Sequence, residues 1–109
     1  MIDLTTRRCV PCEGGMLPLS AELVKKYLGE VSNWNVAPDG KSISRKYKFS
    51  DFKAAIAFVN EVADLAEFEG HHPDISISYN KVTLTLSTHA IGGLSENDFI
   101  LAAKINQIG

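Results

Sequence analysis

The segment from Ser50 to Gly70 limits the fold more than any other part of the chain. Its apolar side chains recur at steps of three and four residues, which is the spacing of one face of an amphipathic helix. Those side chains are Phe52, Ala55, Ile56, Val59, Val62, Ala63 and Ala66. Ser50 can cap the first turn, and Gly70 can end the last one. We therefore predict a long helix between these two residues.

Segments that alternate between apolar and polar side chains lie before and after this helix, which is typical of half-buried strands. The predicted strands cover residues 34–36, 42–49, 74–79 and 82–88, and shorter helices cover residues 20–28 and 94–108. Pro38-Asp39-Gly40 and Asn80-Lys81 are the expected turns between paired strands. The order α-β-β-α-β-β-α favours an α+β fold, in which one antiparallel sheet carries helices on one face.

The size of the chain allows one compact domain. The chain has 109 residues, of which 45% are hydrophobic, and we expect residues 19–109 to form that domain. Residues 1–18 contain two prolines and two glycines and are expected to be an irregular N-terminal extension. No apolar run approaches the roughly 18 residues that span a bilayer, and the first residues do not resemble a signal peptide. The expected location is cytoplasmic, with no membrane partner.

The charge pattern does not favour a nucleic-acid partner. The formal net charge is −2, and basic and acidic residues are interspersed. The short run Arg45-Lys46-Tyr47-Lys48 alternates along a predicted strand, which favours a solvated face. Sequence-independent binding to nucleic acid needs many cations that neutralise phosphates, so we predict no direct contact with it.

Cys9 and Cys12 are the only cysteines and form a CxxC pair. A structural zinc site needs four ligands, and no second pair exists. A thioredoxin-type pair would open a helix, whereas Glu13-Gly14-Gly15 follows here. Three alternatives stay open: an inert packing role, a metal site completed by another subunit, and an adventitious disulfide.

The three histidines of the chain are predicted to gather at one end of the sheet. His71 and His72 follow the long helix, and Pro73 forces the residue before it toward extended backbone angles. If Asn80-Lys81 is the turn of the second hairpin, His72 faces His89 at the open end, on the polar side of the sheet.

Glu67 lies one turn before His71, in the last turn of the predicted helix. The negative end of the helix dipole disfavours a carboxylate there by about 0.3–1 kcal/mol. Two interpretations stay open: a histidine partner compensates for this cost, or the glutamate is solvated and tolerates it. Zinc is a further possibility for three histidines. Adjacent histidines rarely reach one ion, however, and neither HxH nor HxxxH spacing occurs, so we predict no metal.

Several of these residues recur in a known signature. Glu67, three residues, His71-His72-Pro73, five residues, Tyr79, nine residues, His89, eight residues and Asp98 follow one another in this order. This spacing resembles the signature of the pterin-4a-carbinolamine dehydratases. Further similarity lies in Trp34-x-Val36, Ile43-x-Arg45, Phe49-x-Asp51-Phe52, Leu86-Ser87-Thr88-His89 and Gly92-Gly93-Leu94, and the resemblance covers residues 19–107. The two cysteines lie outside it.

The resemblance implies a four-stranded antiparallel sheet with three helices on one side. It implies an enzyme, a hydro-lyase that removes water from 4a-hydroxytetrahydrobiopterin (the pterin-4a-carbinolamine) and yields quinonoid dihydropterin. This reaction belongs to tetrahydrobiopterin recycling and biosynthesis and uses no metal or organic cofactor. The resemblance also implies a homodimer or homotetramer.

The resemblance assigns acid–base roles to His71 and His89, which would serve hydroxyls on different faces of the pterin ring. An unperturbed imidazole titrates near pH 6.5, which suits protonation of a leaving hydroxyl. His72 and Pro73 are expected to bind and orient the pterin. Glu67 is expected to hydrogen-bond His71 and to hold its tautomer.

Two further members of the predicted site have competing explanations. Ser95-x-x-Asp98 is similar to a capping box, with Asp in place of the usual Glu or Gln, and Asp98 is also expected to orient His89. Trp34 either flanks the pterin or lies in the core. Tyr79 belongs to the signature but falls on the apolar face of its predicted strand, so we interpret it as a packing residue.

Three other functions stay open on the sequence alone. The first is a non-catalytic module that binds proteins as a coactivator. The second is a dehydratase that acts on another pterin, because the histidine cluster suits proton transfer at any bicyclic ring. The third is a zinc protein that uses Cys9, Cys12 and histidines.

Overall fold

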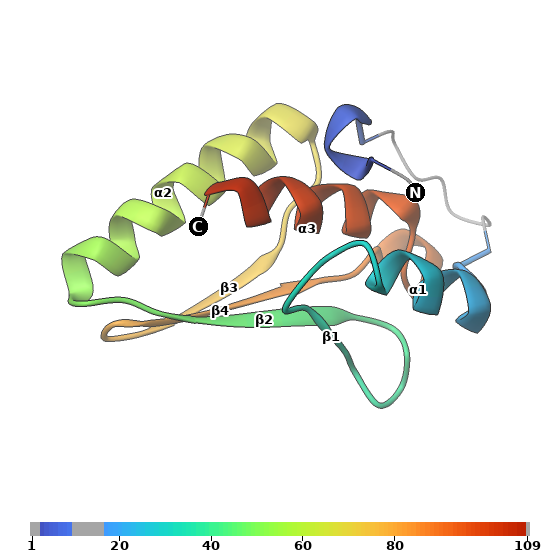
Figure 1. Ribbon diagram of the computed structural model, residues 1–109, viewed down its shortest axis with the longest axis horizontal. Coiled ribbons are helices and arrows are strands. Elements are labelled where there is room, and N and C mark those ends of the chain that lie inside the picture. The colour runs from blue at the N-terminus through green and yellow to red at the C-terminus, as the bar shows by residue number, and fades with distance from the viewer. Residues whose placement is uncertain (1–2, 10–16, 109) are drawn as a thin grey trace.

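A computed structural model describes residues 3–9 and 17–108 of the chain. In this part of the chain a four-stranded antiparallel sheet has the order β1-β2-β4-β3, and three α-helices lie on one face of it (Figure 1). The elements are α1 (Ala21–Leu28), β1 (Asn35–Val36), β2 (Ile43–Lys48), α2 (Phe52–Glu69), β3 (Asp74–Ser78), β4 (Lys81–Leu86) and α3 (Glu96–Ile108). The predicted fold class and element order are confirmed.

The long helix α2 begins one residue later than predicted. Its N-cap is Asp51, whose carboxylate accepts a hydrogen bond from the Ala54 backbone N–H at 2.8 Å, so Ser50 is not the cap. The predicted end is correct, because Gly70 adopts φ 70°, in the left-handed region that glycine enters at little cost. His71 therefore lies directly after the helix cap, in the short segment that leads to β3.

The core lies between the sheet and the helices. Ile43 on β2 and Val82, Leu84 and Leu86 on β4 are fully buried, and Phe99 on α3 is buried with them. The opposite face of β2 and β4 carries no helix in the described part of the chain (Figure 1). Its side chains are polar and at least partly exposed. The alternation along the sequence predicted both faces.

The turn between β3 and β4 lies one residue earlier than predicted, which shifts the pairing of the two strands by two residues. Ser78 pairs with Lys81 and Ile75 pairs with Leu84, so the turn is Tyr79-Asn80 and not Asn80-Lys81. Tyr79 has φ 54°, which a residue with a bulky side chain rarely adopts. A shift of two residues leaves every side chain on its predicted face, but His72 no longer falls opposite His89.

Strand β3 forms an edge of the sheet, and all five of its residues are exposed. Ile75 and Ile77 face the helix side and are still 38% exposed. Tyr79 is 67% exposed, so the prediction that it is a packing residue is wrong. Tyr79 lies in the turn beyond β3, and β3 pairs with a strand on only one side.

The described part of the N-terminal extension contains one short helix between irregular residues. Leu4–Thr6 forms a 3-10 helix, labelled η1, which Asp3 caps through its side chain. Leu4 is buried in the core, and η1 packs against α3. Part of the predicted extension therefore packs against the domain, and the boundary at residue 18 stays a prediction.

Candidate active site

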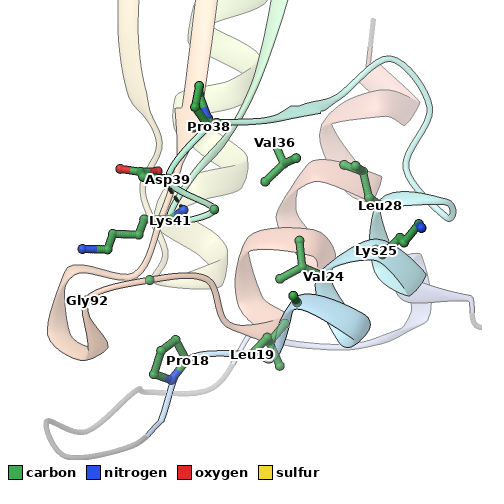
Figure 2. Close-up of a pocket in the computed structure, with 14 residues that line it drawn as sticks. Pro18, Leu19, Val24, Lys25, Leu28, Val36, Pro38, Asp39, Lys41 and Gly92 are labelled. Atoms are coloured by element: carbon green, nitrogen blue, oxygen red, sulfur yellow. Dashed lines mark hydrogen bonds between the residues drawn. The ribbon is translucent and has the colours of Figure 1, made fainter.

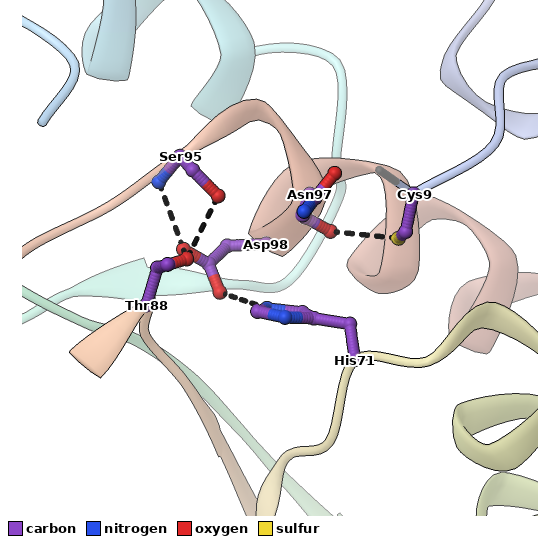
Figure 3. A network of polar contacts seen from close by, with 6 residues as sticks. All are labelled: Cys9, His71, Thr88, Ser95, Asn97 and Asp98. Atoms are coloured by element: carbon purple, nitrogen blue, oxygen red, sulfur yellow. Dashed lines mark hydrogen bonds and ion pairs between the residues drawn. The ribbon is translucent and has the colours of Figure 1, made fainter. Parts of the chain in front are cut away.

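His71 lies at the exit of α2 and bonds to a buried carboxylate. Its Nε2 is 2.6 Å from Oδ1 of Asp98, in the first turn of α3 (Figure 3). The His71 side chain is 13% exposed and that of Asp98 is fully buried. The pair thus joins the end of one helix to the beginning of another, far apart in sequence.

The second oxygen of Asp98 is also occupied. Its Oδ2 accepts hydrogen bonds from the Ser95 backbone N–H and from Thr88 Oγ1, each at 2.9 Å. Ser95 Oγ lies 2.7 Å from Thr88 Oγ1 (Figure 3). An ionised carboxylate only accepts hydrogen bonds, so Nε2 of His71 is the donor to Asp98. The remaining ring nitrogen of His71, Nδ1, is then left to exchange a proton.

The bond from Ser95 N–H to Asp98 is one half of the capping box that the sequence predicted. Ser95 immediately precedes α3 and Asp98 is its third residue. Asp98 therefore caps α3 and holds a histidine at once, as expected. The histidine that it holds is His71, whereas the sequence analysis assigned it to His89.

His72 points to a different carboxylate. Its Nε2 lies 2.5 Å from Oε2 of Glu67, and both side chains are exposed, by 59% and 78%. The expected bond between Glu67 and His71 is therefore wrong, although the expectation that Glu67 has a histidine partner is correct. Two adjacent histidines thus bond to two carboxylates in different surroundings, one pair buried and the other in solvent.

His89 opens a short closed loop after β4. It begins the 3-10 helix η2 (His89–Ile91), and its carbonyl accepts a hydrogen bond from the N–H of Gly92, which has φ 68°. Thr88 and Gly93 close the loop through a bridge, in which Thr88 N–H donates to Gly93 O at 2.8 Å. The imidazole of His89 is exposed on this loop. Thr88 thus holds the loop of His89 through its backbone and Asp98 through its side chain.

His89 lines a cleft of about 390 Å³ on the face of the sheet that carries no helix in the described residues. The cleft is also lined by Asp39, Lys41, Ser42, Asp74, Thr85, Ser87, Thr88, Gly92 and Gly93. Of the described histidines, His71 and His72 do not line it. The three imidazoles therefore do not line one cleft. Hydrogen bonds connect His71 through Asp98 to Thr88, and Thr88 immediately precedes His89 in the chain.

Trp34 lies in the core and not in this cleft. It is 4% exposed, and its indole N–H donates to Oδ1 of Asn106 at 2.8 Å. Arg45 donates to the same oxygen at 2.6 Å. Of the two explanations that the sequence left open for Trp34, the structure supports packing.

Comparison with known proteins assigns the chain to a family. The family model for pterin 4 alpha carbinolamine dehydratase matches residues 17–108. The chain belongs to this family. A curated protein of Azoarcus sp. (strain BH72), named "Putative pterin-4-alpha-carbinolamine dehydratase", is 46% identical over 97% of this chain and 91% of its own length. A protein of the same name from Nitrosospira multiformis is 48% identical over 97% of this chain and 92% of its own.

Two solved structures share the fold of the dehydratase family with this chain. A transcriptional coactivator/pterin dehydratase from Brucella melitensis superposes with a TM-score of 0.79 at 34% identity, covering 84% of this chain and 97% of that one. A pterin dehydratase-like protein described as a RuBisCO assembly factor in the alpha-carboxysome has a TM-score of 0.60 at 22% identity, covering 70% and 88%. The second similarity concerns the fold alone.

Two residues of this candidate site were not identified as site residues from the sequence. Thr88 was noted only as part of a similar segment, and Ser95 only as a cap. Both are buried and bond to Asp98 or to each other. Neither residue type is distinctive alone, because buried hydroxyls are common. Their role in holding Asp98 follows only from the structure, in which the residues after β4 bond to the beginning of α3.

No cluster of three or more metal-ligating side chains occurs among the described residues. Cys9 Sγ donates to the Asn97 carbonyl at 3.6 Å, and burial, followed by the charge of Glu69, raises the pKa of this thiol to about 12. This favours a packing role for Cys9, while Cys12 lies outside the described residues. None of the helices described is both long enough and apolar enough to cross a membrane.

Proposed function

We propose that this chain dehydrates a 4a-hydroxytetrahydropterin to the quinonoid dihydropterin, with His71 and His89 exchanging the protons. The observation that carries the proposal is the route from His71 through Asp98 and Thr88 to the loop of His89, in a member of this family. Two imidazoles held on one framework can act on two atoms of one bicyclic ring.

The reaction requires one proton delivered and one removed. An imidazolium protonates the hydroxyl on C4a, the C4a–O bond breaks, and water leaves. The lone pair of N5 forms the C4a=N5 double bond, and the proton on N5 passes to a neutral imidazole. General acid–base help of this kind is typically worth roughly 10²–10⁴-fold.

The two histidines divide these tasks by their surroundings. His89 is exposed at the cleft, so it can take a proton from solvent and act as the acid toward the hydroxyl. Asp98 fixes His71 with its Nε2 as donor, so the lone pair lies on Nδ1, which can accept the N5 proton. Asp98 acts through His71 and is a positioning residue.

His72, Pro73 and Glu67 would bind and orient the pterin. Continuing the pairing of β3 with β4 by two residues beyond Asp74 and Thr85 brings His72 opposite Ser87, which lines the cleft. Glu67 would hold the ring of His72 through its bond at 2.5 Å. We therefore propose Glu67 as a partner of His72 and not of His71. Trp34 lies in the core, so we propose no contact between Trp34 and the pterin.

Stopped-flow absorbance of carbinolamine decay tests the function. We expect wild type to accelerate the decay and His71→Ala and His89→Ala each to lower kcat by about 10²-fold or more. His72→Ala is the matched control, because it removes an adjacent imidazole and should mainly raise KM. Wild-type rates in both of the first two variants would contradict the proposed roles, and no acceleration by wild type would contradict the function.

We also propose that the chain forms a homodimer or homotetramer. Strand β3 leaves one side of its backbone without a neighbouring strand in the described part of the chain, and Ile75 and Ile77 beside it are partly exposed. Such an edge readily pairs with a strand of a second copy. Sedimentation equilibrium should show the oligomer, and Ile77→Lys should weaken it. The cytoplasmic location and the lack of a cofactor stay predictions.

A further inference from the structure

Glu69 is a buried carboxylate that the proposed mechanism does not use. It is the last residue of α2 and lies two residues before His71. Its side chain is 1% exposed, and each of its oxygens accepts one hydrogen bond. Oε1 accepts from the Cys9 backbone N–H at 3.0 Å, and Oε2 accepts from Lys104 Nζ at 2.6 Å. Two partners from distant parts of the chain thus hold this carboxylate in one place.

The bond to Lys104 adds a second connection between the two helices that the His71–Asp98 pair joins. Asp98 is the third residue of α3 and Lys104 is the ninth. At a rise of about 1.5 Å per residue, the two connections lie about 9 Å apart along the axis of α3. One connection would let the end of α2 pivot, whereas two that lie apart also fix its direction.

Cys9 bonds to both sides of the same junction. Its N–H donates to Glu69 on α2, and its Sγ donates to the Asn97 carbonyl on α3 at 3.6 Å. Figure 3 shows this second bond beside the His71–Asp98 pair. Cys9 therefore connects the last turn of α2 to the first turn of α3, at the junction that holds the imidazole.

An ion pair this deep in the protein is a poor source of stability. The side chains of Glu69 and Lys104 are only 1% and 13% exposed. Taking two charges out of water is costly, and apolar side chains of similar volume often stabilise a fold as well or better. Hydrogen bonds between charged groups differ from apolar contacts because they depend on angle as well as on distance. The pair is therefore better explained by the direction that it gives to the end of α2.

The last turn of α2 transmits its position to His71. The backbone N–H groups of Gly70 and His71 both donate to the Ala66 carbonyl, at 2.8 and 3.3 Å. A rotation of this turn therefore moves the imidazole with it. A displacement of about 1 Å in a catalytic site can cost about 10²-fold in rate.

We propose that Glu69 is a positioning residue for the dehydration: through Lys104 and Cys9 it fixes the direction of the His71 imidazole. This inference rests on the proposed function, in which Nδ1 of His71 accepts the N5 proton. Glu69 acts through His71 and is not itself a catalytic residue.

The loop of His89 has a separate support. It packs against the chain before α1, where a Cβ on Gly93 would lie 2.8 Å from Cβ of Pro18 (Figure 2). The Leu19 N–H donates to the Leu94 carbonyl at 2.8 Å in the same region. These contacts lie outside α2. A change at the end of α2 should therefore leave this imidazole unaffected, which makes it an internal reference.

Stopped-flow kinetics of the full chain tests the proposal. Glu69→Gln and Lys104→Met should each lower kcat for the 4a-hydroxytetrahydropterin by about tenfold, with KM within about twofold of wild type. Lys104→Arg keeps the cation and should stay closer to wild type than Lys104→Met does. If Lys104→Met fails to fold, Glu69→Gln decides the question, because its amide oxygen can still accept from the Cys9 N–H.

Asn106→Ala is the matched control for a general loss of stability. Asn106 also lies on α3, but its amide oxygen accepts from the Trp34 indole at 2.8 Å and from Arg45 at 2.6 Å, neither of which belongs to α2. The substitution removes the acceptor of these two donors, so Tm should fall. In contrast, kcat should stay within about twofold of wild type.

The imidazole nitrogens report on His71 without turnover. In protein labelled with nitrogen-15 histidine, near pH 8, where an ordinary imidazole is neutral, the wild-type shifts of His71 should show the proton on Nε2, which bonds to Asp98. In the two variants that break the ion pair, these shifts should move toward the average of the two tautomers, because a displaced ring bonds less well to Asp98. The shifts of His89 should stay those of wild type in every variant.

The outcomes separate this inference from the proposed function. Wild-type kcat and unchanged His71 shifts in folded Glu69→Gln and Lys104→Met would overturn the positioning role and leave the function standing. An equal loss of kcat in Asn106→Ala would also overturn it, because the loss would then follow stability. No dehydration by wild type would overturn the function, and the His71 shifts would still decide whether Glu69 positions this imidazole.

Discussion

Asp98→Asn separates the charge of this residue from its shape. Ser95 N–H and the Thr88 hydroxyl both donate to Oδ2 of Asp98, so an asparagine must place its carbonyl oxygen at that point. Its NH₂ group then faces Nε2 of His71, where the carboxylate oxygen lies now. Because NH₂ only donates, His71 must accept at Nε2 and carry its proton on Nδ1. The nitrogen proposed to accept the N5 proton is then blocked.

The expected effect on catalysis follows from losing one of the two proton-transfer groups. We expect kcat to fall by about 10²-fold, at the lower end of the range for such groups, with a change in KM of no more than a few-fold. The variant should also be less stable by about 1–3 kcal/mol, because a buried charged network is weakened. Tm should fall by roughly 5–15 °C, so the assay belongs well below the new midpoint.

The assay is stopped-flow decay of the carbinolamine for wild type, Asp98→Asn, His71→Ala and the double variant. If Asp98 acts through His71, the double variant is no slower than His71→Ala alone. Glu67→Gln is the control, since it makes the same change beside the exposed His72 and should leave kcat within a few-fold. Wild-type kcat in Asp98→Asn would refute the reasoning, as would an undiminished effect of Asp98→Asn in the His71→Ala background.

Three further predictions concern stability and reactivity. Burial raises the pKa of Glu69, but the Cys9 N–H and Lys104 outweigh it and lower the pKa. The contribution of ionised Glu69 to the free energy of unfolding is full above the pKa of the unfolded chain and is lost as the pH falls through the lower pKa of the folded chain. In urea titrations, the free energies of unfolding of Glu69→Gln and wild type should therefore converge below about pH 4. In a Cys12→Ser variant, the raised pKa of Cys9 should slow alkylation at pH 8 by about 10²–10³-fold relative to the unfolded chain, as mass spectrometry would show. Gly92→Ala should cost about 1 kcal/mol in thermal unfolding, because φ is 68° and nothing crowds the added Cβ.

The faces of the elements could be predicted from the sequence, but the register of the hairpin could not. The alternation of Val82, Leu84 and Leu86 identifies the buried side of β4 whatever its partner. The predicted register depended on which residues form the turn, and Asn80-Lys81 was predicted as that turn. The structure instead uses Tyr79 at φ 54°, a conformation that the local sequence does not favour.

The carboxylate partners of His71 and His72 could not be predicted from the sequence. His71, His72, Glu67 and Asp98 all proved to be members of two histidine–carboxylate pairs. Spacing along the chain suggested Glu67 for His71 because both lie near one helix face. The left-handed Gly70 redirects the chain just before His71, so sequence distance no longer measures spatial distance there. A single left-handed residue thus decided which carboxylate each imidazole meets.

Cys9 connects the beginning of the chain to this site. Its backbone N–H bonds to Oε1 of Glu69 at 3.0 Å, and Lys104 on α3 holds the other oxygen at 2.6 Å. Glu69 is two residues before His71, on the last turn of α2. Residues 3–9 lie outside the stretch that the family model matches, yet they support the end of α2, which His71 and His72 follow. Members that differ only in this leading segment can therefore differ in turnover while sharing every signature residue.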